Sequence, residues 1–341
     1  MPPVRAFTCS NCGQLLFFDN SVCLGCGYAV GFVPETLELD VADPSARRCA
    51  NLSLAGCNWL IDADDANALC VSCRLTRTRP NDNDRPAMVA FAVAERAKRQ
   101  LLFQVLSIGL QVRDRFEDPA AGLAFDLLSS RNLEVMTGHE DGIITLDLSE
   151  SDAVHREFVR LQLGEPYRTV LGHLRHEIGH YFWPSLTADP EVLAEFRSLF
   201  GDETISYENA LARHYQSGPP VDWPDRYVSA YATMHPWEDW AETFAHYLHI
   251  QAGLATAAAF GLETGLRTKA AARRSLQDGE PAGAVGSMIH EWLTLSFGLN
   301  AMSYALGQDA LYPFVLSPAV VTKLDFVHRS IRAASLTPLA S

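Results

Sequence analysis

Long apolar runs are absent from the sequence. A membrane-spanning helix needs about 18 largely apolar residues in a row, and no stretch of the 341 residues approaches that composition. The first ten residues also lack the apolar core of a secretory signal, and a CxxC motif already begins at Cys9. We therefore expect neither membrane insertion nor export, and we predict a cytoplasmic protein.

Basic charge is also scarce. The formal net charge is −14, and residues 1–80 hold six arginines, no lysine and eight acidic residues. Proteins that bind nucleic acid need clustered Lys and Arg side chains to neutralise phosphates. The charge balance therefore argues against a nucleic-acid partner for either part of the chain.

Cysteine is missing from most of the chain, since all eight cysteines lie between Cys9 and Cys73. In a reducing compartment, cysteines clustered in this way bind metal ions more often than they form disulfides. A polar, proline-bracketed stretch follows at 80–86, and it cannot continue a helix or a strand. These features predict a cysteine-rich region at 1–80 and a separate domain at 81–341.

The first four cysteines form two CxxCG turns, one with Cys9 and Cys12 and one with Cys23 and Cys26. A CxxC turn directs two sulfur atoms at one point, and the following glycine permits the left-handed backbone that lets amides face the thiolates. Two such turns complete a tetrahedral site with four sulfur ligands. Zinc is the commoner ion in such sites, although iron of the rubredoxin type uses the same ligands.

The other four cysteines, Cys49, Cys57, Cys70 and Cys73, are spaced irregularly, and only the last two form a CxxC. Four free, partly buried thiols are one interpretation. Their concentration within 25 residues favours the other, a second site with four sulfur ligands. The N-terminal region is thus predicted to hold one or two structural zinc ions.

Helical patterns dominate the chain after residue 86. Residues 88–110 carry apolar side chains at helical spacing, with charged side chains off that stripe. The apolar stripe consists of Val89, Val93, Ala97, Leu101 and Val105, and the charged residues are Glu95, Arg96, Lys98 and Arg99.

A β-branched run predicts a strand at 142–148, followed by a helix capped by Ser149. A second helix is expected from Tyr167 to Trp183, because Pro184 should end it. Further helices are predicted at 189–200, 204–216, 236–256, 286–305 and 318–335. We therefore predict an α+β fold that is mostly α.

The helix at 167–183 carries the sequence His176-Glu177-Ile178-Gly179-His180, an HExxH motif. Successive helical residues are rotated by roughly 100°, so residues four apart point in nearly the same direction. Both imidazoles can therefore bind one zinc ion, and Glu177 can reach a water on it as the general base. The flanking Leu174, Ile178 and Phe182 predict a buried helix, in which unpaired polar side chains would be costly.

A catalytic zinc ion takes a third protein ligand and leaves one position for water. The predicted helix at 236–256 places Glu238 and Glu242 one turn apart on one face. We favour Glu238 as the ligand, with Glu242 accepting the outer N–H of a ligating histidine, although the roles could be exchanged. Tyr231 or His235 could donate to the oxyanion, and for each of them plain packing is the alternative.

These motifs lie in long strings that resemble a family, the bacterial zinc-binding metallopeptidases with an N-terminal zinc-ribbon domain. The strings include CxxCGQLLFF, RRCANLSLAGCNWL, GEPYRTVLGHLRHEIGHYFW and SAYATMHPWEDWAETFAHYLH, and the similarity extends from Phe7 to about Gly261. The resemblance implies zinc ribbons followed by a zincin-like peptidase domain. It also implies the gluzincin arrangement, in which an acidic residue of a later helix joins His176 and His180.

The sequence therefore predicts a zinc-dependent metallopeptidase that acts on a peptide or protein. The alternative is a protein-interaction or regulatory module, in which the zinc ribbons recruit a partner and the HExxH helix holds zinc without useful turnover. Both interpretations share the same metal sites.

Overall fold

The computed structural model describes residues 6–42, 47–130, 135–152, 156–157, 169–263 and 284–336. The chain divides into two compact units, Met1–Tyr181 and Phe182–Ser341. The fold is mixed α and β, about half helical, as predicted. The domain limits at 1–80 and 81–341 stay a prediction.

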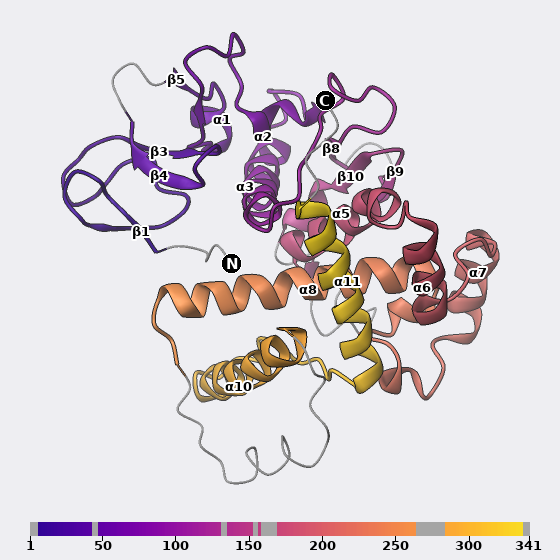
Figure 1. Cartoon of the computed structure of the whole chain (residues 1–341). Coiled ribbons are helices and arrows are strands. Elements are labelled where there is room, and N and C mark those ends of the chain that lie inside the picture. Colours follow the sequence, from indigo (N-terminus) through magenta and orange to yellow (C-terminus); the bar gives the residue numbers. More distant parts are fainter. Residues whose placement is uncertain are drawn as a thin grey trace. The chain divides into compact units, whose positions relative to one another are not determined.

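The first unit begins with short antiparallel strand pairs (Figure 1), and the cysteines lie in the turns and short helices that follow these strands. β1 (Phe7–Thr8) pairs with β2 (Leu15–Leu16), β3 (Val30–Val33) with β4 (Glu38–Val41), and β5 (Arg47–Arg48) with β6 (Leu60–Ile61). Two four-residue helices follow β5 and β6, namely α1 (Leu52–Ala55) and α2 (Val71–Arg74). Elements this short cannot bury much surface, so the region depends on other contacts for its stability.

A cluster of aromatic rings supplies those contacts by joining the ribbon strands to α3 (Arg85–Ser107). Phe103 of α3 lies 5.0 Å from Phe18 and 5.5 Å from Phe32, measured between ring centroids. Phe32 in turn lies 4.7 Å from Trp59. Because these rings share one core, the ribbon and the first long helix form a single packed body.

Helix α3 is present as predicted, and Ala97, Leu101 and Val105 of the predicted stripe are buried, but the buried face is not limited to that stripe. Val89 and Val93 are exposed, whereas Glu95, Lys98 and Arg99, which we expected on the polar face, are buried. The reason is that α3 packs against α1 and α2, where these three side chains find polar partners. The helix starts at Arg85, because Asp84 caps it by accepting from the Ala87 N–H.

A four-stranded sheet in the order β7-β8-β10-β9 completes the regular part of the first unit. The strands are β7 (Thr76–Thr78), β8 (Ala124–Leu128), β9 (Gly138–Glu140) and β10 (Ile143–Asp147). β10 confirms the predicted strand, and it pairs with β8 in parallel and with β9 antiparallel.

The helix expected after β10 is wrong at its start. The chain forms a 3-10 turn, η1 (Leu148–Ser151), and Asp147 rather than Ser149 caps it, since its side chain accepts from the Ser149 N–H. The remainder of the expected helix falls largely outside the described residues.

Helix α5 (Val170–Leu186) contains the HExxH motif and runs from the first unit into the second. The prediction that Pro184 ends this helix is wrong, because Pro184 lies inside it and the Thr187 N–H still bonds to the Trp183 carbonyl at 3.0 Å. Packing of Phe182 and Trp183 against other aromatic rings offsets the bond that proline cannot donate. The beginning of the predicted helix, at 167–168, lies outside the described residues.

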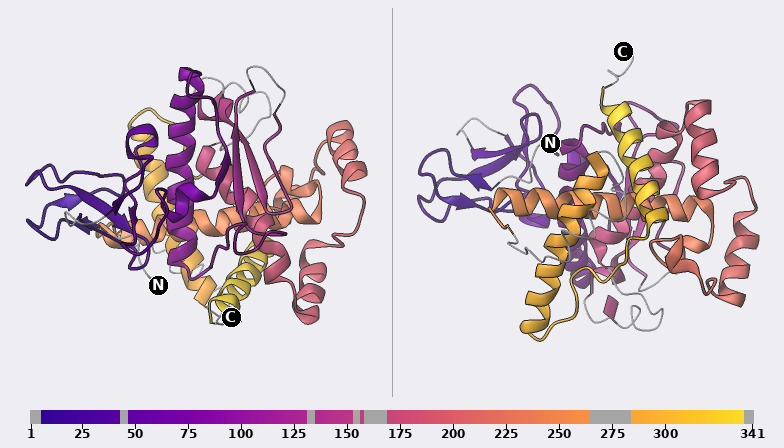
Figure 2. Two further views of the ribbon diagram at one scale, coloured as in Figure 1. Left: turned by 90° about the horizontal axis from the view of Figure 1, so that it is seen from above. Right: turned by 60° about the horizontal axis from the view of Figure 1, so that its bottom comes forward.

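The second unit is helical within its described residues, and the five predicted helices are confirmed. They are α6 (Pro190–Phe200), α7 (Tyr207–Ser217), α8 (Pro236–Ala259), α10 (Ala284–Ala305) and α11 (Pro318–Leu336). Helices α8 and α11 pack against each other, and both contact α6 and α10 (Figure 2). Their shared core is aromatic, with Trp240, Phe196, Phe200 and Phe326 in mutual contact. Nowhere in the described chain is there a helix with the length and apolar character needed to cross a membrane.

A buried ion pair joins α8 to α11. Lys323 donates to Asp239 at 2.5 Å and to the carbonyl of Arg226 at 2.9 Å. Burial raises the pKa of the Asp239 carboxyl from its ordinary value of 3.8 to about 7, although the Lys323 ammonium opposes that rise. Asp239 is therefore the buried ion-pair partner of Lys323.

We predict that Lys323→Met destabilises the protein by about 3 kcal/mol at pH 8 and by less at pH 5. A carboxyl whose pKa is higher in the folded state binds protons more tightly there, so its contribution to stability falls as pH rises from 3.8 towards 7. Without the ammonium the pKa rises further, which extends the loss to higher pH. Urea unfolding at both pH values measures the effect.

The double variant Lys323→Met/Asp239→Asn is the control, because it removes the titrating group. The pH dependence that Asp239 contributes should be absent from this variant, so its stability should fall less between pH 5 and pH 8 than that of Lys323→Met. An equal loss for Lys323→Met at the two pH values would contradict the assignment.

Candidate metal centres

The first four cysteines come together at the tips of the ribbon strands. The sulfur atoms of Cys9, Cys12, Cys23 and Cys26 all lie within 4.8 Å of one another, and the Cys9–Cys26 and Cys12–Cys23 pairs are 3.7 and 3.6 Å apart. Zinc–sulfur bonds of about 2.3 Å at tetrahedral angles separate neighbouring sulfurs by about 3.8 Å. The spacing fits a zinc ion and is far too long for disulfides.

Each CxxC turn ends on a glycine in the left-handed region, Gly13 at φ 74° and Gly27 at φ 75°. Their N–H groups bond to the carbonyls of Cys9 and Cys23, both at 2.8 Å. A side chain would meet no nearby atom at either position. Backbone conformation, and not space, is therefore what requires glycine there.

The second four cysteines also converge, despite their irregular spacing. Cys49, Cys57, Cys70 and Cys73 are all buried, their sulfur atoms lie within 4.8 Å of one another, and the Cys57 and Cys70 sulfurs are 3.6 Å apart. Helix α1 and a left-handed Gly56 (φ 62°) turn the chain back so that Cys57 meets the CxxC of α2. This convergence supports the prediction of a second zinc site over that of four unrelated thiols.

Charged side chains of α3 lie beneath the second cluster. The Cys73 thiol donates to Glu95 at 3.7 Å, and Lys98 donates to the same carboxylate at 2.7 Å. Burial raises the pKa of Glu95, and Lys98 opposes that rise. Because four thiolates around a zinc ion carry excess negative charge, a buried ammonium next to them stabilises the loaded site.

The two histidines of the HExxH motif point at a common position. The Nε2 atoms of His176 and His180 are 3.2 Å apart, and two nitrogens bound to one zinc ion at about 2.0–2.1 Å are separated by about 3.3 Å. The helix that holds them is buried, since Leu174 and Ile178 are fully inaccessible. Its donor set and spacing therefore fit zinc.

Contacts on either side fix the orientation of this helix. The Gly172 N–H bonds to the Thr169 hydroxyl at 2.9 Å, and Arg175 donates to Gln104 of α3 at 3.0 Å. Glu177, the predicted base, directly follows His176 in the sequence, and its side chain is buried.

One further histidine, which the sequence did not identify, lies beside the pair. The ring of His139 in β9 stacks on His180 with 6.2 Å between centroids, and its Nε2 accepts from the Gly142 N–H at 3.2 Å. Burial is the main cause that lowers the pKa of His139 to about 4, and the neighbouring His180 imidazole adds to it. Its imidazole is therefore neutral at physiological pH.

The two candidate carboxylates lie on α8 in the second unit, each held by a hydroxyl. Tyr207 of α7 donates to Glu238 at 2.9 Å, and Ser229 donates to Glu242 at 2.6 Å. Glu238 is buried, whereas Glu242 is half-buried. Tyr207 and Ser229 were not identified from the sequence, because no motif links these positions to the glutamates.

Tyr231 and His235, the two proposed oxyanion donors, have different surroundings. Burial is the main cause that raises the pKa of Tyr231, with the charge of Glu238 adding to it, so the phenol stays protonated. His235 caps α8 by accepting from the Trp237 N–H at 3.1 Å, while its Nε2 lies 3.1 Å from the Ile205 carbonyl. Both ring nitrogens of His235 therefore hold the start of α8.

Comparison with known proteins decides the family. Residues 87–330, more than half of the chain, match the family described as "Putative zinc-binding metallo-peptidase". The chain belongs to this family. Residues 6–84 of the chain also match a zinc-ribbon domain. The family assignment agrees with the resemblance inferred from the sequence.

Similar proteins occur in mycobacteria. Uncharacterized proteins of Mycobacterium tuberculosis (strains H37Rv and CDC 1551) and Mycobacterium bovis are 49% identical to this chain over 331 residues. The alignments cover 95% of this chain and 94% of each relative. No solved structure matches.

We expect Cys57→Ser to remove one equivalent of zinc from the protein. The unfolding temperature should also fall by about 10 °C, because the second cluster is buried against α3. Cys12→Ser, at an exposed position, should also remove one equivalent but cost less stability. Metal analysis by mass spectrometry and thermal unfolding followed by circular dichroism measure the two effects. Unchanged zinc in Cys57→Ser would favour four free thiols.

Proposed function

We propose that the chain is a zinc-dependent peptidase that hydrolyses peptide bonds of a peptide or protein substrate. The observation that carries the proposal is the pair of HExxH imidazole nitrogens, 3.2 Å apart on a buried helix. Two histidines at that spacing are the ligand pair of an HExxH zinc site. Three zinc ions are proposed in all, one catalytic and two structural in the cysteine clusters.

Glu238 is proposed as the third protein ligand. Trp183, three residues after His180 in α5, packs its ring at 5.8 Å from Trp237, the residue before Glu238. Phe182 likewise lies 6.2 Å from Phe244 of α8. These contacts pair the last turns of α5 with α8, which supports a ligand from the first turn of α8.

The hydrogen bond from Tyr207 agrees with that role. A carboxylate that binds zinc through one oxygen is usually held by a hydrogen bond to its other oxygen, which fixes its orientation. Glu242 is one turn further along α8, where we propose that it accepts the outer N–H of a ligating histidine and so fixes the tautomer. Ser229 holds one oxygen of Glu242 by a hydrogen bond of 2.6 Å, which fixes the orientation of the carboxylate.

A zinc ion bound there would lower the pKa of a water molecule towards about 7 and polarise the substrate carbonyl. Glu177 takes a proton from the attacking water and delivers it to the leaving amine. Tyr231, held protonated by its buried surroundings, donates to the developing oxyanion. We assign His235 to the cap of α8 and not to the oxyanion, since its ring nitrogens already have partners.

Glu177→Gln should lower peptide hydrolysis by about 10²–10⁴-fold while leaving the zinc content unchanged, because glutamine keeps the shape but cannot accept a proton. Digestion of an unbiased peptide library, read by mass spectrometry, measures activity, and metal analysis measures zinc. Full residual activity in the variant would refute the base assignment. A zinc-loaded wild-type protein that cleaves nothing would instead favour the interaction-module alternative.

Replacing the two candidate carboxylates one at a time separates their roles. We expect Glu238→Ala to lose the catalytic zinc and all activity, and Glu242→Ala to retain zinc at saturating concentration with roughly 10–100-fold weaker affinity. Glu208→Ala, at an exposed site on α7, is the matched control. The reverse pattern of zinc loss would exchange the assignments of Glu238 and Glu242.

A further inference from the structure

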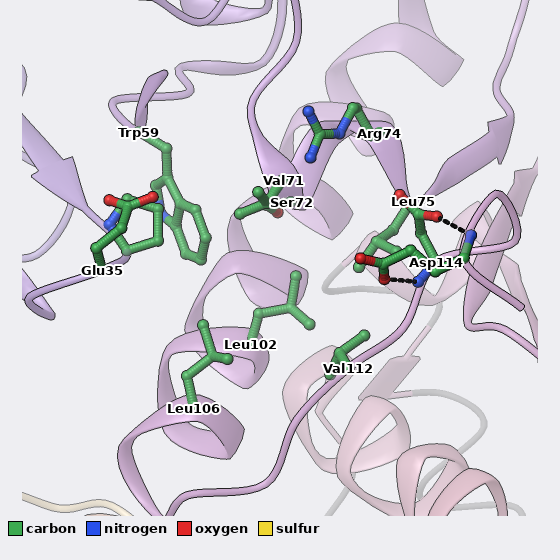
Figure 3. Close-up of a pocket in the computed structure, with 12 residues that line it drawn as sticks. Glu35, Trp59, Val71, Ser72, Arg74, Leu75, Leu102, Leu106, Val112 and Asp114 are labelled. Carbon is green, nitrogen blue, oxygen red and sulfur yellow. Dashed lines mark hydrogen bonds between the residues drawn. The ribbon is translucent and has the colours of Figure 1, made fainter. Parts of the chain in front are cut away.

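A pocket of about 260 Å³ lies between the ribbon and α3, inside the first unit (Figure 3). Its walls are mainly apolar: Trp59, Val71, Leu75, Leu102, Leu106 and Val112. In Figure 3, Leu102 and Leu106 rise from α3 on one side, with Trp59 and Glu35 across from Leu75 and Asp114. The volume is just below the range of about 300–1,000 Å³ typical of small-molecule pockets, so it suits a short segment.

Two polar side chains in the walls have no hydrogen-bond partner within the described part of the chain. They are the Trp59 indole N–H and the Ser72 hydroxyl, and both residues are 0% exposed. An unmatched buried donor or acceptor costs about 1–3 kcal/mol. Because neither group is accessible to solvent, this cost belongs to the wall itself and plays no part in the recognition of a ligand.

The charges around the pocket are mostly negative. Glu35, Asp114 and Glu117 line it, and Arg74 is the one basic side chain among its lining residues. Arg74 already forms an ion pair with Asp65. Its charge is therefore shared, which leaves the rim complementary to a cationic group.

We propose that this pocket binds a polypeptide segment of a partner protein in which a large apolar side chain stands next to a lysine or arginine. The apolar side chain packs against the accessible apolar lining residues Val71, Leu106 and Val112, and the basic side chain pairs with Glu35 at the rim. The inference goes beyond the proposed hydrolysis, since it involves no catalytic group.

Ser72 lies between Cys70 and Cys73, so the pocket is built on the second cysteine cluster. Its opposite wall is α3, whose Glu95 contacts Cys73 of that cluster and is paired with Lys98. The partner segment therefore recognises a surface that the cluster holds in shape.

Selection from a phage library of random octapeptides tests the proposal, with the zinc-loaded full-length Glu177→Gln variant as bait so that bound peptides are not cleaved. The enriched peptides should combine a large apolar residue with Lys or Arg within two positions. Binding of the selected peptides, measured by fluorescence anisotropy, should weaken with added salt.

Glu35→Lys in the same background should weaken binding by roughly tenfold, because it reverses a charge at the exposed rim. Asp64→Lys is the matched control, since it makes the same kind of charge change at an exposed ribbon position outside the pocket lining, and it should bind as the parent does. Leu106→Ser should also weaken binding.

Several outcomes would overturn the proposal. These are no enrichment, enrichment of acidic peptides, or equal effects of Glu35→Lys and Asp64→Lys. Self-association of the free protein that Glu35→Lys abolishes would show that a second copy of the chain fills the pocket instead. None of these outcomes depends on peptide cleavage, so they leave the proposed catalytic function to its own test.

Discussion

The structure depends on holding side chains that bind metal ions at metal-binding distances inside buried surroundings. Two histidine nitrogens 3.2 Å apart, and sulfurs 3.6–3.7 Å apart, are arrangements that water cannot stabilise, because the groups compete for one small volume. Burial of polar groups is costly unless they are paired. A divalent ion at the histidine pair and at each cysteine cluster would offset that cost. The ribbon in particular has few other sources of stability, because its strands are short and its helices have only four residues.

Much of this was predictable from the sequence, and the reasons are physical. Residues four apart on a helix share a face whatever the rest of the fold does, so His176 and His180 could be placed from spacing alone. The same holds for the CxxCG turns, which need only a local backbone conformation. The later helices were also predictable, since their apolar periodicity and capping residues are local signals, as at Pro236 and Pro318.

What could not be predicted depends on contacts between distant segments. The buried face of α3 differs from its apolar stripe, because Glu95 and Lys98 are stabilised by partners on the ribbon and not by apolar packing. Tyr207 and Ser229 contact the glutamates across 31 and 13 residues, and no pattern marks such a pair. His139 reaches His180 only because β9 lies at the edge of the sheet. Each error arose where long-range contacts outweighed a local preference.

Helix α3 touches two chemically different places along its 23 residues. Near its middle, Glu95 contacts Cys73 of the second cluster and is paired with Lys98, and about two turns later Gln104 bonds to Arg175, the residue before His176. One continuous helix therefore contacts both the second cysteine cluster and the HExxH helix. A substitution that moves α3 relative to the cluster should also change the contact between Gln104 and Arg175.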